Sequence, residues 1–116
     1  LLRGGEVVDG TELARERRPA ARTDRDLARG PARLCSALGL DRSDDGALLG
    51  GPGSRISLTL PEARRAPDPA RIRSGPRTGV AGPGGDGSSF PWRFWLHGEP
   101  TVSPYRPAAP RRRRQD

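Results

Sequence analysis

Residues 27–39 read LARGPARLCSALG, and this stretch carries the strongest helix signal in the chain. Gly30 suits the N-cap, Pro31 suits the first helical position, and Gly39 suits the left-handed residue that follows a helix C-terminus. The two leucines after Pro31 are four residues apart, so they lie on one face. The sequence therefore predicts a helix over residues 30–39 with an apolar face.

Shorter secondary-structure patterns flank this helix on both sides. Residues 1–8 favour a strand, and Asp9 is expected to cap a helix over TELARERR, residues 11–18. Residues 54–60, SRISLTL, alternate between polar and apolar side chains, as is typical of a half-buried strand. A further short strand is expected around Ile72. The segments between these elements are rich in proline, glycine and charge.

The aromatic residues are concentrated near the end of the chain. Residues 90–97, FPWRFWLH, contain both tryptophans, both phenylalanines and the only histidine. This run predicts a strand that the turn HGEP closes.

Composition bounds the size of the core and the kind of partner. The formal charge is +7, and all 21 basic residues are arginine. Such a charge favours polyanionic partners, although a GC-rich gene would also give arginine in place of lysine. Only 32% of the residues are hydrophobic, against roughly 45–50% in a typical soluble domain. A chain this short and polar buries a thin core, so we expect a fragment of a larger domain.

The remaining sequence signals narrow the class of protein. Cys35 is the only cysteine, so it forms neither an internal disulfide nor a zinc site, which fits a reducing compartment. No apolar run approaches the ~20 residues that span a membrane, and no signal peptide is visible. We therefore expect a cytoplasmic protein with no membrane partner.

Three arginine positions are candidates for binding an anion. Arg33 falls in the first turn of the predicted helix, where it opposes the helix dipole unless a phosphate docks there; the alternative is that it points into water. Glycines on both sides of Arg77-Thr78 allow close approach to a ligand, or mark an ordinary connection between strands. Arg3 follows two leucines and is expected to point either to solvent or into a polar pocket.

The residues do not by themselves assemble a catalytic or metal site. His97 borders a turn, and the sequence has no metal-ligand cluster and no phosphate-binding G-x-x-x-x-G-K motif. We therefore expect no metal and no cofactor. The run Arg111–Arg114 attracts any polyanion without specificity.

Four segments taken in order resemble the C-terminal half of the 3-methyladenine (alkylpurine) DNA glycosylase family. They are LLRGGEVVDGTELARERR, DLARGPARLCSALGLDRSDDG, GPRTGV and PWRFWLHGEPTVS, and the resemblance runs from Leu1 to about Ser103. It implies a mixed α/β (α+β) fold, a single domain over residues 1–103 with a curved antiparallel sheet and surrounding helices, here without its N-terminal part. The aromatic run would pack in a core strand of that sheet, and residues 104–116 would be a disordered basic tail.

The resemblance also implies an activity. Members of this family act in base-excision repair: they bind damaged double-stranded DNA as monomers, flip the lesion out and hydrolyse its N-glycosidic bond. Their substrates are alkylated or deaminated purines such as 3-methyladenine, 7-methylguanine and hypoxanthine. The reaction uses a glutamate-activated water, with no metal and no lyase step. The expected location is the cytoplasm of a bacterium, at the nucleoid.

Several residues match positions that have roles in this family. Arg3 matches the arginine beside the nucleophilic water, and the main-chain carbonyl of Thr78 matches a group that holds this water. The expected DNA contacts are Arg18, Arg33, Arg77 and Gly79. The catalytic glutamate, the intercalating tyrosine and the pocket aromatics lie N-terminal to Leu1 in the family, so residues 1–116 alone are expected to be inactive.

Two other interpretations stay open at this point. The chain could be a non-enzymatic, largely disordered protein that binds nucleic acid through its arginines. It could also be a spurious or decayed reading frame from GC-rich DNA, which the four ordered segments disfavour.

Overall fold

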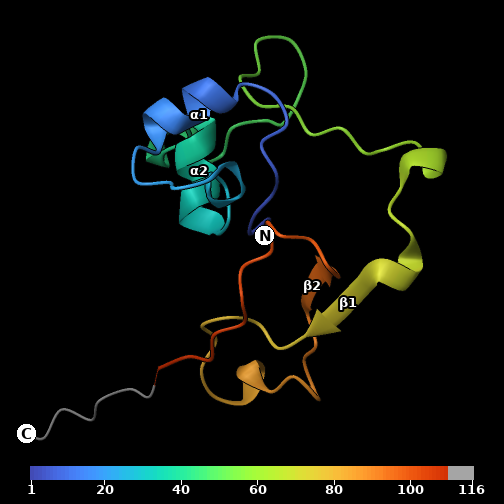
Figure 1. The fold of residues 1–116 in the computed structure, drawn as a ribbon. Coiled ribbons are helices and arrows are strands. Elements are labelled where there is room, and N and C mark those ends of the chain that lie inside the picture. The colour runs from blue at the N-terminus through green and yellow to red at the C-terminus, as the bar shows by residue number, and fades with distance from the viewer. Residues whose placement is uncertain (110–116) are drawn as a thin grey trace, which may run out of the picture. The chain divides into compact units, whose positions relative to one another are not determined.

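The computed structural model describes residues 1–109. These residues form two α-helices and a two-stranded antiparallel sheet (Figure 1). Helix α1 spans Thr11–Arg17, helix α2 spans Pro31–Leu38, strand β1 spans Ile72–Gly75 and strand β2 spans Arg93–Leu96. Short 3₁₀ turns occur at Asp24–Asp26, Arg42–Asp44, Ala63–Arg65, Pro69–Arg71 and Pro83–Gly85. The mixed α/β class with an antiparallel sheet is confirmed.

The chain divides into two compact units. The helical unit comprises Leu1–Ala66 and Pro100–Ser103 and contains α1 and α2. The hairpin unit comprises Pro67–Glu99 and the segment that begins at Pro104, and it contains β1 and β2.

Helix α2 forms where the sequence predicts it. Gly30 is its N-cap with φ 128°, Pro31 is its first residue, and Gly39 follows it in the left-handed conformation with φ 68°. The amide of Leu40 then donates to the carbonyl of Cys35 at 2.9 Å, which satisfies one of the carbonyls at the helix end. A side chain at Gly39 would also meet the guanidinium of Arg17, whose Cζ lies 2.8 Å from the position of a Cβ.

Helix α1 is confirmed, but its predicted N-cap is wrong. Gly10 occupies the cap with φ 68°, and the carboxylate of Asp9 accepts from the Gly10 amide at 2.8 Å. A left-handed residue is needed at this position, and glycine adopts that conformation without the steric cost that a side chain carries.

The core of the helical unit is small. Leu27 is its only large, fully buried side chain among the described residues, with an exposed fraction of 0%. Three buried alanines from both helices and the segment between them surround it: Ala14, Ala28 and Ala37. Val7, Ala21 and Leu34 pack against this cluster. Apolar burial in this unit therefore depends on one leucine.

The strands predicted at residues 1–8 and 54–60 are wrong. Residues 1–8 contain no strand, and residues 54–60 make only an isolated parallel bridge between Ile56 and Leu49. Alternation gives a segment two faces, but a strand also needs a neighbour for its N–H and C=O groups. No strand of the described residues lies beside either segment, and Leu60 is 81% exposed.

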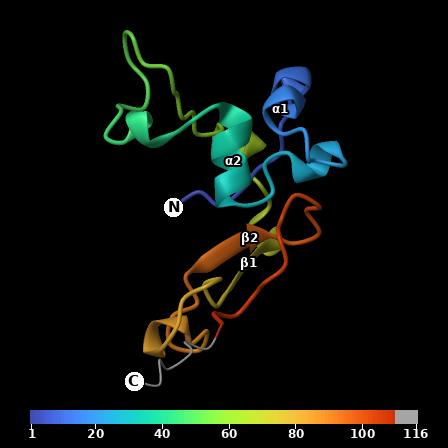
Figure 2. The ribbon, with the colours of Figure 1, turned by 90° about the vertical axis from the view of Figure 1, so that its left-hand side faces the viewer.

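The hairpin unit is built on the predicted strands at Ile72 and in the aromatic run. Gly75 pairs with Arg93 and Ile72 pairs with Leu96, so β1 and β2 lie side by side (Figure 2). The ring of Trp95 lies 3.2 Å from the position of a Cβ on Gly75, which explains a glycine there.

The prediction that the aromatic run packs in a core strand is wrong for Trp92 and Phe94. Phe94 is 68% exposed and Trp92 is also exposed, so neither side chain is part of a core. Trp95 is half-buried, and the guanidinium of Arg93 lies 4.5 Å from its ring centroid.

Residues 104–109 contain neither helix nor strand, and the remainder of the predicted basic tail, residues 110–116, lies outside the described residues. The predicted domain boundary at residue 103 stays a prediction. Neither α1 nor α2 has the length or the apolar content to cross a bilayer, and no other helix of residues 1–109 does.

We expect Leu27→Ala to destabilise the chain by about 2–5 kcal/mol, because it empties the centre of a core that has no other large, fully buried side chain. The matched control is Leu60→Ala, which removes the same atoms from an exposed position. Urea unfolding followed by far-UV circular dichroism measures both. Equal losses from the two substitutions would contradict the assigned core.

Candidate nucleic-acid interface

The predicted phosphate contact Arg33 lies at the third position of α2 and is exposed. Its side chain makes no hydrogen bond or ion pair with any residue of 1–109, so its five N–H donors face solvent. The start of α2 also leaves amide groups without helical partners. The geometry therefore leaves both the charge and the helix terminus available to an anion.

The negative charge of Asp26 interacts with the positive charge of Arg33. A hydrogen bond from the Thr23 hydroxyl, 2.8 Å from Oδ2, lowers the pKa of Asp26 below its ordinary value, while burial acts in the opposite direction. The positive charges of Arg25, Arg29 and Arg33 lower it further. Asp26 is therefore ionised at neutral pH, within a group of three arginines.

Arg3 belongs to a segment that lies against the start of α2. The amide of Gly5 donates to the carbonyl of Ala28 at 3.2 Å, and a Cβ on Gly4 would lie 3.0 Å from that carbonyl. Arg3 itself is half-buried and makes no hydrogen bond or ion pair with the described residues. The structure thus brings together the segments that carry Arg3 and Arg33.

Arg18 is held by the protein itself. Its Nε donates to the carbonyl of Leu27 at 3.1 Å, and its Nη2 donates to the carbonyl of Asp26 at 3.4 Å. One guanidinium therefore fixes the carbonyl groups of the turn that precedes α2.

Arg29 has a comparable role, which the sequence did not reveal. Its Nε and Nη2 donate to the carbonyl of Val102 at 3.2 and 3.1 Å, and its Nη1 lies 3.7 Å from Asp26. These bonds attach the segment Pro100–Ser103 to the helical unit. Only the fold brings Val102 to Arg29, so no local pattern could have indicated this partner.

In the hairpin unit, Arg77 packs within the protein. Its guanidinium lies 5.2 Å from the ring centroid of Trp92, and its Nη2 donates to the carbonyl of Gly84 at 2.8 Å. Its buried Nε has no partner among the described residues. Phe90 meets Trp92 edge to face at 5.1 Å, so Arg77 belongs to a small aromatic layer.

Thr78 and Gly79 form the turn that follows. Gly79 has φ 75°, which favours glycine, and its amide donates to the carbonyl of Arg106 at 3.2 Å. Thr78 is half-buried. The predicted site residues thus fall into two groups, with Arg3, Arg18 and Arg33 in the helical unit and the Arg77–Gly79 segment in the hairpin unit.

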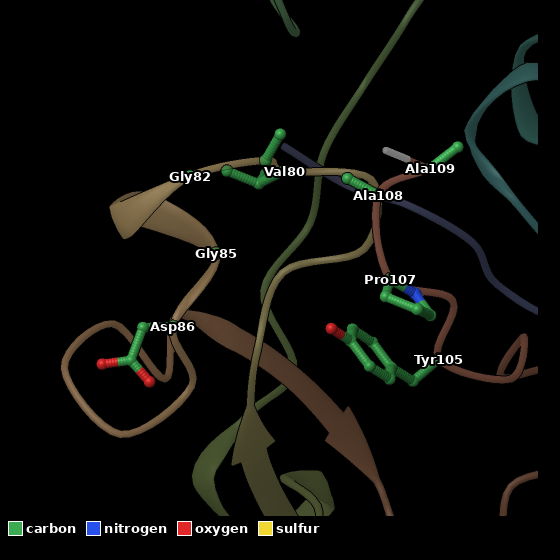
Figure 3. A pocket seen from close by; sticks show the side chains of 9 residues that line it. Val80, Gly82, Gly85, Asp86, Tyr105, Pro107, Ala108 and Ala109 are labelled. Carbon is green, nitrogen blue, oxygen red and sulfur yellow. The ribbon is translucent and has the colours of Figure 1, made fainter. Parts of the chain in front are cut away.

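An open cavity of about 590 Å³ lies beside this turn (Figure 3). A glycine-rich loop forms one wall and residues from the segment after Ser103 form the other; the lining residues are Val80, Ala81, Gly82, Gly85, Asp86, Tyr105, Pro107, Ala108 and Ala109. Amides of Ser88 and Ser89 donate to the two carboxylate oxygens of Asp86, each at 3.1 Å. A hydrogen bond from the Ser89 side chain, and after it the bonds from the two amides, lower the pKa of Asp86, while burial acts in the opposite direction.

The described residues include no group of three or more His, Cys, Asp or Glu side chains that could hold a metal ion. The backbone of His97 extends the pairing of the hairpin, because its amide donates to the carbonyl of Arg71 at 2.7 Å.

The comparisons with known proteins agree with the resemblance. The family model described as methylpurine-DNA glycosylase (MPG) matches residues 1–100. The chain belongs to this family. Three relatives carry the name 3-methyladenine DNA glycosylase. They are 54% identical in Streptomyces avermitilis, 53% in Leifsonia xyli subsp. xyli and 49% in Nocardia farcinica, over 98, 91 and 95% of this chain.

The chain spans about half the length of the curated relatives it matches, with 51, 48 and 50% of the three proteins covered. The methylpurine-DNA glycosylase match includes both helices, both strands and the residues Arg3, Arg33 and Thr78. It ends before the segment that forms the second wall of the cavity.

We expect Thr23→Val to raise the pKa of Asp26 toward its ordinary value of 3.8, because the hydroxyl that stabilises the carboxylate is lost. A pKa below that of the unfolded chain stabilises the fold above about pH 4, and this stabilisation is lost as the pH falls through the folded pKa. NMR titration of the carboxyl carbons measures the shift. Asp41, whose pKa Ser43 lowers, is the internal control. An unmoved Asp26 would contradict the assigned cause.

Proposed function

We propose that this chain forms the DNA-binding and water-positioning part of a base-excision repair glycosylase that hydrolyses the N-glycosidic bond of alkylated purines. Its membership of the methylpurine-DNA glycosylase family supports the reaction class. The name that its relatives carry supports 3-methyladenine as a substrate. The family resemblance extends the proposal to 7-methylguanine and hypoxanthine.

The observation that carries the proposal is the pair of unengaged arginines at the start of α2. Arg3 and Arg33 lie on segments that the Gly5–Ala28 hydrogen bond joins, and neither guanidinium bonds to a residue of 1–109. DNA offers a row of phosphates, and neutralising them with arginine releases condensed counterions. Arg33 is proposed to bind a phosphate, and Arg3 to act beside the lesion.

The proposed chemistry is hydrolysis of the bond between C1′ and the purine. The oxygen of a water bonds to C1′, and the electron pair of the broken bond leaves with the purine. The main-chain carbonyl of Thr78 accepts a hydrogen bond from this water and orients it. The proton goes to a glutamate that the resemblance places outside residues 1–116. These residues alone therefore release no base.

The other predicted contacts support this arrangement. Gly79 has no side chain, so DNA can approach the turn closely. Arg18 and Arg77 already donate to carbonyls of the protein, so we propose that they hold the turns that face DNA. Only their remaining N–H groups are proposed to contact phosphate.

The lesion must leave the base stack before it reacts. Flipping a nucleotide costs a few kcal/mol and costs least at damaged or mispaired bases, which contributes to selectivity. The complete glycosylase is proposed to act as a monomer on chromosomal DNA at the nucleoid of a bacterium, without a metal.

We expect Arg33→Gln to weaken duplex binding at every sequence and to reduce the slope of log K against log salt concentration by about 0.9, the value for one lost phosphate contact. The matched control is Arg65→Gln, another exposed arginine whose side chain makes no hydrogen bond or ion pair among residues 1–109. Fluorescence anisotropy over a series of NaCl concentrations measures both slopes. An unchanged slope for Arg33→Gln would contradict the proposed phosphate contact.

The activity is tested in a chimera in which residues 1–116 replace the matching half of the S. avermitilis relative. We expect the chimera to excise 3-methyladenine from a duplex. We expect Arg3→Ala in this chimera to lower the single-turnover excision rate at least tenfold more than duplex affinity. Equal losses of excision rate and duplex affinity would contradict the proposed role of Arg3 beside the lesion. A folded chimera that binds DNA and excises nothing would favour a non-enzymatic nucleic-acid-binding chain.

A further inference from the structure

We infer that residues 104–109, here named the arm, are an additional contact for the DNA backbone, mounted on the Thr78–Gly79 turn. The inference rests on the proposed function, because that function places the turn beside the lesion. Within the arm, Arg106 is the residue that would bind phosphate.

A backbone hydrogen bond anchors the arm. The Gly79 amide donates to the Arg106 carbonyl at 3.2 Å, although neither residue belongs to a strand. The turn that is proposed to hold the nucleophilic water through Thr78 is therefore bonded, at the next residue, to the middle of the arm. Any anion that Arg106 binds would lie close to this turn.

The arm faces the glycine-rich loop across the open cavity. Tyr105, Pro107 and Ala108 form one wall of the cavity, and Val80 and Gly82 belong to the opposite wall (Figure 3). The two walls line an open cavity and Tyr105 is 41% exposed, so the anchoring rests on the backbone hydrogen bond and not on apolar burial.

Arg106 is on the free side of the arm. It does not line the cavity, although the residues before and after it do. It is exposed and makes no side-chain hydrogen bond or ion pair within residues 1–109. Asp86 is the acidic residue in the cavity wall, and amides of its own loop occupy both of its oxygens. The charge of Arg106 is therefore available to a polyanion.

The arm lies beyond the family match, which ends at residue 100. Its contact with DNA would therefore add to the contacts of the matched segment. Duplex DNA fits this position better than a small anion does, because the arm contributes one exposed charge and no second donor that would enclose a phosphate. One such charge adds about 0.9 to the salt slope of duplex binding.

The test uses the full 116-residue chain and an undamaged fluorescein-labelled duplex, so it needs no excision. We expect Arg106→Gln to reduce the salt slope by about 0.9 and to weaken binding at low salt, while Arg65→Gln changes neither. Binding that Arg106→Gln leaves unchanged, or that Arg65→Gln reduces equally, overturns the inference. Failure to bind any duplex also overturns it.

Arg33→Gln separates this inference from the proposed function. If Arg33→Gln reduces the slope and Arg106→Gln does not, the arm contact fails and the proposed phosphate contact at α2 stands. If only Arg106→Gln reduces the slope, the arm contact stands and the contact at α2 fails.

The anchor has a readout that does not depend on DNA. Hydrogen exchange of the Gly79 amide is expected to be slow in the full chain and at least tenfold faster in a chain that ends at Ser103, because the acceptor carbonyl is then absent. Equal exchange rates in the two chains would overturn the anchored arm.

Discussion

Arginine guanidinium groups that donate to backbone carbonyls hold this small fold in place. Arg17 donates to Ala37, Arg18 to Leu27 and Asp26, Arg29 to Val102, and Arg77 to Gly84. The apolar core of the helical unit could not fix these segments alone, because it consists of one large side chain and three alanines. Hydrogen bonds to a charged group contribute about 1.5–3 kcal/mol each. The flat guanidinium offers several N–H groups at fixed angles, as no lysine can.

Two classes of arginine in residues 1–109 differ in how the guanidinium is used. In one class the guanidinium donates to backbone carbonyls of other segments of the protein. In the other class, which includes Arg3, Arg33 and Arg106, the side chain makes no hydrogen bond or ion pair within residues 1–109. The net charge of +7 alone does not make this distinction, since each arginine contributes one positive charge whatever its contacts. The proposed DNA contacts come from the second class, and the first class positions the turns that carry them.

The sequence predicted correctly the helix whose two ends carry glycine and proline residues with a fixed conformational role. Gly30, Pro31 and Gly39 delimit α2 correctly, since each acts through its own backbone conformation. The alternating segment at residues 54–60 failed for a different reason: a strand depends on a partner that the segment does not contain. The exposure of Phe94 has the same origin, because a sheet face is buried only by another layer.

The candidate site could be predicted only in part for the same physical reason. The position of Arg33 in the first turn of a helix follows from a local pattern, and the structure leaves that guanidinium free. The carbonyls that occupy Arg18 and Arg77 lie seven to nine residues away, and the one that occupies Arg29 lies 73 residues away. These pairings depend on how turns fold back on one another, which residue types alone do not specify.

The division of the arginines is tested most directly by NMR spectra of their Nε–H groups, recorded while the chain is titrated with duplex DNA. The account predicts that the Nε–H signals of Arg33 and Arg106 shift as DNA is added. Those of Arg18 and Arg29, which bond to carbonyls, should exchange slowly with solvent and keep their positions. Shifts confined to Arg18 and Arg29, with Arg33 and Arg106 unmoved, would contradict it.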